Sequence, residues 1–302
     1  MENRLYQELC MALGEANVLF QEPMWKHTTF RVGGNAAYFV TPESAEGVKR
    51  TIELCKEYSI PFYVIGNGSN LLVSDEGFSG VILQICGNMK ECQMTEGKIK
   101  VQAGALLTKV ANQISKAGYT GMEFAVGIPG TVGGAVAMNA GAYGGEIKDV
   151  ITSASVLTKE GQVIRLDKEA LKLGYRTSTV IEREYIVLEA EFQLEKGNIQ
   201  EIQNICNKNT KARVEKQPLE YPSAGSTFKR PEGYFAGKLI MDAGLRGFTV
   251  GGAQVSEKHC GFVINKGNAT AKDIMDVITQ VQEKVQAAFG VTLETEVKMI
   301  GF

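Results

Sequence analysis

The stretch that decides the fold is GMEFAVGIPGTVGGAVAMNAGAYGG, residues 121–145, which carries eight glycines in 25 residues. A shorter cluster, Gly66-Asn67-Gly68-Ser69-Asn70, lies upstream at the end of an apolar run. Glycines let backbone N–H groups approach an anionic ligand closely. Two such segments in one domain favour a cofactor that bears a diphosphate. The alternative, that these glycines only form turns, stays open at this point.

The common nucleotide motifs do not match these glycines. The run from Gly66 to Leu71 lacks the third glycine of the Rossmann fingerprint. The run from Gly233 to Leu239 is one residue short of a P-loop, and Leu239 stands where Ser or Thr would bind magnesium. Neither a standard Rossmann dehydrogenase nor a P-loop ATPase is indicated.

Hydrophobic periodicity outside the glycine segments predicts a mixed α+β chain. Helices are predicted over residues 3–19, 44–58, 105–117, 198–213, 234–241 and 271–289. Strands are predicted within 30–40, where a turn separates two of them, and at 60–65, 81–86, 99–102, 150–158, 162–166, 185–194, 261–265 and 291–300. The prolines at 218 and 222, in the runs 216–218 and 221–222, favour a domain boundary there, and the length of 302 residues suits two domains.

Composition limits the classes of function. The chain has 32 basic and 34 acidic residues, so we expect no nucleic-acid or membrane-surface partner. No basic n-region with an apolar core opens the chain and no apolar run is long enough to span a bilayer, so we expect a cytoplasmic protein. The six cysteines are irregularly spaced and are expected to be reduced. Only His27 and His259 could offer imidazole, so no metal site is expected.

A set of motifs, in order along essentially the whole chain, is similar to one family. They are TFRVGGNA at 29–36, GNGSNLL at 66–72, GIPGTVGGA at 127–135, YRTS at 175–178, YPSAGSTF at 221–228, GGAQVS at 251–256 and ETEV at 294–297. On these residues the chain resembles the UDP-N-acetylenolpyruvoylglucosamine reductases, flavoenzymes of peptidoglycan precursor synthesis. The run from Phe192 to Lys216 leaves no room for a tyrosine-bearing insertion, so the chain looks like the shorter form of that family.

The resemblance implies an FAD-binding fold of the PCMH or vanillyl-alcohol-oxidase type, in two lobes, with a C-terminal α+β substrate domain. The expected domains are an N-terminal helix and lead-in at 1–29, the FAD-binding domain at 30–196 and the substrate domain at 210–302. FAD is expected to be held non-covalently, with NADPH as co-substrate. The residues implied in FAD binding are Gly66, Asn67, Gly68, Ser69, Asn70, Leu71, Gly127, Ile128, Pro129, Gly130, Thr131, Gly133, Gly134, Ala135 and Asn139.

The family reaction reduces an enolpyruvyl ether to a lactyl ether. A hydride passes from NADPH to FAD and then to the enolpyruvyl methylene carbon, after which the α-carbon is protonated. The double bond accepts hydride only if the resulting negative charge spreads into the adjacent carboxylate, which calls for a fixed cation and a proton donor. The resemblance implies Arg176 as the cation, Ser226 as the proton donor and Glu296 as the group that stabilises the intermediate.

Each of these residues also has a simpler interpretation. Arg176 could be a surface arginine and Ser226 a turn serine. Glu296 could lie on a solvated strand face, and Glu294, two residues before it, is an alternative for the same role. The match to the family motifs favours the functional assignments.

Other polar residues are candidates for the substrate. Lys216, Lys229 and Gln254 are predicted to bind the UDP-sugar enolpyruvate, with Arg230 and Lys238 as weaker candidates. His259 is expected to be a hydrogen-bonding histidine rather than a general base. Cys260 departs from the small residue expected there, and it is expected to pack as a small hydrophobe. The chain is expected to act as a monomer.

Two other functions share part of the evidence. A PCMH-type oxidase that uses oxygen would keep the glycine loops and FAD but would not need Arg176, Ser226 and Glu296 together. A non-catalytic protein that binds nucleotides or cell-wall precursors would also tolerate loss of those three residues. Their joint presence favours the reductase.

Overall fold

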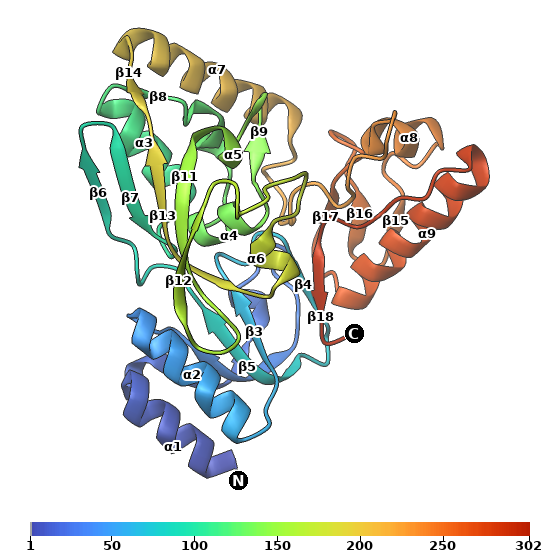
Figure 1. Ribbon diagram of the computed structural model, residues 1–302. Coiled ribbons are helices and arrows are strands. Elements are labelled where there is room, and N and C mark those ends of the chain that lie inside the picture. The colour runs from blue at the N-terminus through green and yellow to red at the C-terminus, as the bar shows by residue number, and fades with distance from the viewer. Residues whose placement is uncertain (1) are drawn as a thin grey trace. The chain divides into compact units, whose positions relative to one another are not determined.

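The computed structural model describes residues 2–302 and divides into two compact units (Figure 1). Unit 1 comprises residues 1–20, 38–67 and 80–213, and unit 2 comprises residues 21–37, 68–79 and 214–302. The predicted functional domains, 30–196 and 210–302, stay a prediction. Two short segments from the N-terminal third, 21–37 and 68–79, group with the C-terminal third in unit 2.

A four-stranded sheet opens the chain, in the order β1 (Val18–Pro23), β2 (Asn35–Val40), β5 (Phe78–Gln84) and β3 (Phe62–Ile65). The β3–β5 pair is parallel, and α2 (Ala45–Glu57) connects β2 to β3. The N-terminal helix α1 (Glu2–Leu13) packs against α2 and buries Leu5 and Leu9 (Figure 1). Apolar residues at helical spacing on α1 therefore form part of the core of unit 1.

The second sheet of unit 1 has five strands that pair only in antiparallel fashion. Its order is β12 (Val163–Asp167), β11 (Ile151–Leu157), β13 (Ile186–Gln193), β7 (Lys98–Gln102) and β6 (Cys92–Thr95). Most residues of the central strand β13 are buried, including the first three, Ile186, Val187 and Leu188. Helix α4 (Val132–Ala137) packs against this strand. The glycine-rich segment thus lies at the covered face of this sheet.

Further helices, turns and short strand pairs complete unit 1. They are the 3₁₀ turns η1 (Glu15–Asn17) and η3 (Glu123–Gly127), the strand pairs β8 (Tyr119–Thr120) with β14 (Glu195–Lys196) and β9 (Gly141–Ala142) with β10 (Gly145–Glu146), and the helices α3 (Leu107–Lys116), α5 (Ile147–Val150), α6 (Thr179–Glu182) and α7 (Ile199–Lys216), whose last three residues fall in unit 2.

Unit 2 is built on a three-stranded antiparallel sheet, β15 (Thr249–Val250), β16 (Ala253–Val255) and β17 (Val263–Asn265). The long helix α9 (Ala271–Phe289) packs along this sheet, and α8 (Ala236–Asp242) contacts α9 (Figure 1). The strand β4 (Leu71–Val73) pairs in parallel with β18 (Lys298–Ile300), and η2 (Met24–Lys26) also belongs to this unit.

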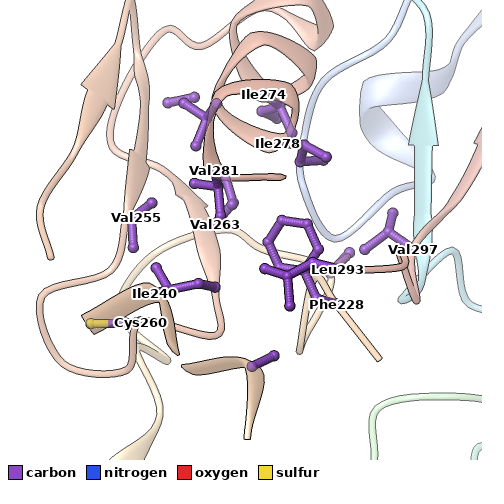
Figure 2. Close-up of a cluster of buried hydrophobic side chains, with 14 of the residues drawn as sticks. Phe228, Ile240, Val255, Cys260, Val263, Ile274, Ile278, Val281, Leu293 and Val297 are labelled. Atoms are coloured by element: carbon purple, nitrogen blue, oxygen red, sulfur yellow. The ribbon is translucent and has the colours of Figure 1, made fainter. Parts of the chain in front are cut away.

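The hydrophobic core of unit 2 gathers side chains from all of these elements. Figure 2 shows Phe228 and Leu293 in the same buried cluster as the α9 stripe formed by Ile274, Ile278 and Val281. The stripe has the 3.6-residue period that the sequence predicts for 271–289, so the predicted helix is confirmed with the same bounds. Thr270 caps its first turn, and Gly290 ends it with a positive φ of 68°.

Two of the sequence predictions for the N-terminal region are wrong. The helix predicted over 3–19 ends at Leu13, because Gly14 has a φ of 84°, and Val18–Pro23 is a strand. The two strands predicted within 30–40 reduce to β2, since residues 31–34 are irregular. Arg31 has a φ of 57° and Gly33 a φ of 115°, and neither suits a strand.

The final predicted strand, 291–300, is only partly formed. Regular pairing is confined to Lys298–Ile300, with one isolated bridge between Thr295 and Phe228. Leu293 and Val297 are nevertheless buried, as the alternation predicts. Among residues 2–302, no helix is long and apolar enough to cross a membrane.

Candidate active site

The two glycine segments that the sequence predicts to hold the cofactor meet inside unit 1. The amide of Asn67 donates a hydrogen bond to the carbonyl of Pro129 at 2.5 Å, across 62 residues of chain. A side chain at Gly66 would collide with the hydroxyl of Thr131. Glycine at 66 is therefore required by close approach, and the two segments form one surface.

The 127–139 segment has the local structure of a tight turn into a short helix. Thr131 caps α4 by accepting a hydrogen bond from the N–H of Gly134 at 3.4 Å. Gly133 lies against Ala103, where a Cβ would come within 2.9 Å of the alanine methyl. The structure places the remaining predicted cofactor residues of this segment in the same turn and helix: Gly127, Ile128, Gly130 and Ala135.

The second half of the first loop, from Gly68 onward, belongs to unit 2. Gly68 has a φ of 61°, and a side chain there would collide with the carbonyl of His27. Asn70 donates its side-chain amide to the carbonyl of Glu296 at 3.1 Å, and its own carbonyl accepts from the N–H of Lys298 at 3.0 Å. Ser69 lies between them and Leu71 begins β4. One predicted cofactor residue, Asn70, is thus bonded directly to a predicted catalytic residue.

The segments that carry Ser226 and Glu296 are joined by backbone pairing in unit 2. The N–H of Glu296 donates to the carbonyl of Thr227 at 2.8 Å, and the N–H of Lys229 donates to the carbonyl of Glu294 at 2.8 Å. The buried Thr227 hydroxyl accepts from the N–H of Val263 at 2.9 Å and anchors this segment to β17. Ser226 is exposed and Glu296 is half-buried, so both can be reached from solvent.

The structure separates Glu296 from its alternative, Glu294. Lys229 forms an ion pair with Glu294 at 2.9 Å, and 70% of the Glu294 side chain is exposed. The half-buried position and the bond from Asn70 to its carbonyl distinguish Glu296 from this surface pair. Lys229, a predicted substrate residue, is therefore engaged with Glu294 in this structure.

Arg176 lies in unit 1, within a tight turn from Gly174 to Thr177. These two residues form an isolated antiparallel bridge, with the N–H of Gly174 donating to the carbonyl of Thr177 at 3.0 Å. Arg176 has a φ of 55°, in the left-handed region that non-glycine residues seldom adopt. Its guanidinium lies 5.0 Å from the ring centre of the exposed Tyr175. The role of Arg176 in the reaction stays a prediction.

The side chain of Asn139, predicted to contact the cofactor, is taken up by the protein itself. It is 1% exposed, and its amide nitrogen donates to the Glu146 carboxylate at 2.8 Å and to the Gly174 carbonyl at 3.1 Å. Its side-chain oxygen accepts from the N–H of Lys148 at 2.9 Å. Both N–H bonds of the amide are used, so its part in FAD binding stays a prediction that these contacts do not favour.

Other predicted residues occupy different places. Gln254 is buried, and it bonds to the Gly247 carbonyl, the Thr249 hydroxyl and the Lys266 ammonium. Lys216 is exposed at the end of α7.

The two residues at 259 and 260 are both enclosed. Burial lowers the pKa of His259, whose Nδ1 accepts from the N–H of Gly261 at 3.1 Å, which suits a neutral hydrogen-bonding histidine. Cys260 packs in the apolar core beside Ile240 (Figure 2), and burial raises the pKa of its thiol. Among residues 2–302, no group of three or more His, Cys, Asp or Glu side chains could hold a metal ion.

Arg213 is a residue that the sequence analysis missed. Its Nε is buried without a hydrogen-bond partner among residues 2–302, and burial lowers the pKa of its guanidinium. A Cβ at Gly127 would come within 2.9 Å of its Cδ and 3.0 Å of a terminal nitrogen. A desolvated cation beside a glycine turn fits a ligand that supplies negative charge, as FAD does. No sequence pattern distinguishes Arg213, because it is one of several charged residues in a predicted helix.

Comparison with known proteins finds matching families along the chain. A model of the FAD binding domain matches residues 36–167, and one of the C-terminal domain of UDP-N-acetylenolpyruvoylglucosamine reductase matches residues 217–300. The reductase of that name from Lachnoclostridium phytofermentans is 53% identical over 305 residues, covering 100% of this chain and 98% of the relative.

Solved structures agree on the fold. The reductase from Thermus caldophilus aligns with a TM-score of 0.80 at 34% identity, covering 93% of this chain and 97% of that one. The 4-ethylphenol oxidase of Gulosibacter chungangensis aligns with a TM-score of 0.50 at 15% identity, covering 97% of this chain and 64% of that one, and shows the fold only. The predicted FAD-binding PCMH-type fold is confirmed. With the family model and the full-length identity, the chain belongs to the UDP-N-acetylenolpyruvoylglucosamine reductase family.

Proposed function

We propose that Arg176, Ser226 and Glu296 carry the chemistry of the family reaction in this chain. As a member of the family, the chain is an FAD-dependent oxidoreductase of peptidoglycan precursor synthesis, with NADPH as the reductant. Its reaction reduces the enolpyruvyl ether of UDP-N-acetylglucosamine to a lactyl ether. When bound, FAD supplies a redox group that takes a hydride from NADPH and delivers it to the enolpyruvyl methylene carbon.

Binding of the substrate carboxylate is assigned to Arg176. A guanidinium stays charged and grips a carboxylate through two parallel hydrogen bonds, which fixes the enolpyruvyl plane as well as neutralising it. The same charge stabilises the enolate-like dianion that forms as hydride arrives at the methylene carbon. The tight turn from Gly174 to Thr177 supports this role, because it limits the directions in which the guanidinium can point.

In this proposal Ser226 donates the proton to the α-carbon, and Glu296, as a protonated acid that donates a hydrogen bond, stabilises the dianion that precedes protonation. A serine hydroxyl is a weak acid, so this role needs a fixed position and a polar neighbour. The backbone bond from the N–H of Glu296 to the Thr227 carbonyl supports this assignment, since it joins the Glu296 segment to the residue after Ser226. This bond is the single observation that carries the mechanism.

The UDP diphosphate calls for a cation that the protein has not already paired. Lys216 is exposed at the end of α7, so we assign it to the diphosphate in preference to Lys229, which is paired with Glu294. Six free cysteines agree with the predicted cytoplasmic location, and a monomer remains the proposed form.

An anaerobic absorption experiment tests the function. Oxidised-flavin bands of the purified protein should bleach on addition of NADPH and return on addition of the enolpyruvyl sugar nucleotide. Bleached bands that recover only on admission of air would favour the oxidase alternative and overturn the proposal. Failure to retain flavin after reconstitution would contradict the FAD assignment itself.

A further inference from the structure

We propose that Asn139 is the positioning residue for Arg176, and that Glu146 acts by fixing the orientation of the Asn139 amide. The inference rests on the proposed role of Arg176 and goes beyond it by naming what sets the pose of that side chain. All the residues concerned lie in unit 1.

The first step is the backbone of the Arg176 turn. The Gly174 carbonyl accepts two hydrogen bonds, from the N–H of Thr177 at 3.4 Å and from the Asn139 amide at 3.1 Å. The first of these bonds lies within the turn, whereas the second joins the turn to a residue 35 positions earlier in the chain, so the bond from Asn139 tethers the turn to the rest of the unit. A second tether follows the turn, where the Ser178 hydroxyl donates to the Ala137 carbonyl at 2.6 Å. Both tethers end on the segment around α4.

The second step is the conformation of Asn139 itself. It has a φ of 43°, which asparagine tolerates better than most residues, and it directly follows Met138, the residue that caps α4. The N–H of Lys148 donates to the side-chain oxygen of Asn139, which fixes which end of the amide carries the oxygen. The amide nitrogen therefore points to Glu146 and Gly174. The buried amide thus joins three separate segments of the chain.

The third step is the role of Glu146. Its carboxylate accepts from the Asn139 amide and from the Lys148 ammonium, both at 2.8 Å. The Lys148 bond is the largest cause that lowers the pKa of Glu146, and the charge of Arg176 contributes in the same direction. An ionised acceptor therefore holds one N–H of the amide, which leaves the other directed at Gly174.

Four substitutions test this route. Asn139→Asp preserves size and tolerance of positive φ but replaces both donors with an acceptor. Glu146→Ala removes the acceptor that orients the amide, whereas Glu146→Gln keeps one. Asn88→Ala is the matched control, because it removes an amide bond of the same kind, to the Thr41 carbonyl at 2.9 Å, elsewhere in unit 1.

Calorimetry can distinguish a positioning role from a purely structural one, because it compares the binding affinities of two ligands. Asn139→Asp should weaken binding of the enolpyruvyl sugar nucleotide by about 10- to 100-fold. Binding of UDP-N-acetylglucosamine, which has no enolpyruvyl carboxylate, should not change. Glu146→Ala should give a smaller loss of the same selectivity than Asn139→Asp, Glu146→Gln, which keeps an uncharged acceptor, should give less loss than Glu146→Ala, and Asn88→Ala should give none. Equal weakening of both ligands, or equal effects of Glu146→Gln and Glu146→Ala, would overturn the route through Asn139.

A double-mutant cycle separates this inference from the proposed function. In an Arg176→Ala background, Asn139→Asp should cause no further loss of reoxidation rate with the enolpyruvyl substrate. A multiplicative loss would show that Asn139 acts elsewhere and would refute the inference. If Arg176→Ala by itself left reoxidation at the wild-type rate, the proposed function would fail first. If Asn139→Asp does not fold, the comparison of Glu146→Ala with Glu146→Gln carries the test.

Discussion

The N–H of Glu296 donates to the carbonyl of Thr227 at 2.8 Å, which places Ser226 one residue from the point where two distant segments join. Ser226 and Glu296 are 70 residues apart in the chain, and the hydrophobic core formed by Phe228, Leu293 and Val297 holds their segments side by side (Figure 2). The backbones of the two segments are thus held together by a hydrogen bond and by buried apolar neighbours.

Replacing Ser226 with alanine should separate the two half-reactions. Bleaching of the flavin by NADPH should keep its wild-type rate, whereas reoxidation by the enolpyruvyl substrate should slow by about 10²- to 10⁴-fold, the usual contribution of a positioned proton donor. Anaerobic stopped-flow absorbance measures both rates. Equal loss in both half-reactions would exclude Ser226 as the proton donor. Ser69→Ala, in a predicted cofactor loop, is a useful contrast because it should not affect proton transfer.

Replacing Arg176 with lysine should also act on the second half-reaction. Lysine keeps the charge but cannot form two parallel bonds to a carboxylate, so the KM for the enolpyruvyl substrate should rise and reoxidation should slow. Arg176→Ala should raise the KM and slow reoxidation more than Arg176→Lys does. Steady-state kinetics with each substrate varied in turn provides the measurement. Wild-type reoxidation in Arg176→Ala would remove this residue from the mechanism.

Replacing Arg213 with methionine should reduce the stabilisation that FAD gives without destabilising the apoprotein. The Nε of Arg213 is buried without a partner, so removing the charge relieves a desolvation cost in the apoprotein. The Tm of the apoprotein should stay level or rise, while the increase in Tm that FAD produces should shrink. Thermal denaturation with and without FAD measures both. An unchanged FAD effect would show that Arg213 does not face the cofactor.

Replacing Asp75 with alanine should destabilise unit 2 through the N-terminus of α9. Its carboxylate accepts from the N–H groups of Ala271 and Lys272 at 2.8 and 2.9 Å, although it lies 196 residues away in sequence. Loss of such a cap costs about 1 to 2 kcal/mol of unfolding free energy. Asp276→Ala removes a carboxylate that forms a surface i,i+4 pair on the same helix and should cost about 0.5 kcal/mol or less. Urea denaturation that ranks the two variants the other way would contradict this cap.

The free energy of unfolding should depend on pH through the ionisation of Asp273. Its pKa is lowered, first by the N–H of Thr270 and also by that of Gly252. A depressed folded-state pKa gives stability that is present above the unfolded-state value of about 3.9 and is lost as the pH falls through the folded-state value. Urea midpoints should therefore drop more steeply below about pH 4 for the wild type than for Asp273→Asn. Parallel pH profiles would contradict the assignment.

Local sequence patterns predicted elements wherever one face of a segment is buried along its length. The helix at 271–289 has an unbroken apolar stripe, a capping box at Thr270 and Asp273 and a glycine after its last turn, so its bounds are encoded in nearby residues. The helix predicted over 3–19 fails at Gly14, because the apolar residues after it also suit a strand, and periodicity does not distinguish the two over so few residues.

Some residues of the candidate site can be predicted from the sequence, and others only from the structure. Motif residues such as Gly66, Arg176 and Ser226 are visible in the chain because each belongs to a short pattern that resembles a family. Arg213 carries no pattern, since its importance comes from burial and from its place beside Gly127. Asn139 was grouped with the cofactor loop by its neighbours in sequence, whereas its contacts are with Glu146 and Gly174.

The apolar periods predicted most helices and strands, and the order of the motifs gave the resemblance that implied the FAD-binding fold and the family, both of which the comparisons confirm, because these patterns are encoded in residues close together in the chain. The reacting side chains that the same resemblance implies stay a prediction. The choice between Glu294 and Glu296 and the tether of the Arg176 turn required the folded chain. Burial, an ion pair to Lys229 and the direction of an amide are set by segments far apart in sequence, and no local pattern specifies which of them will meet.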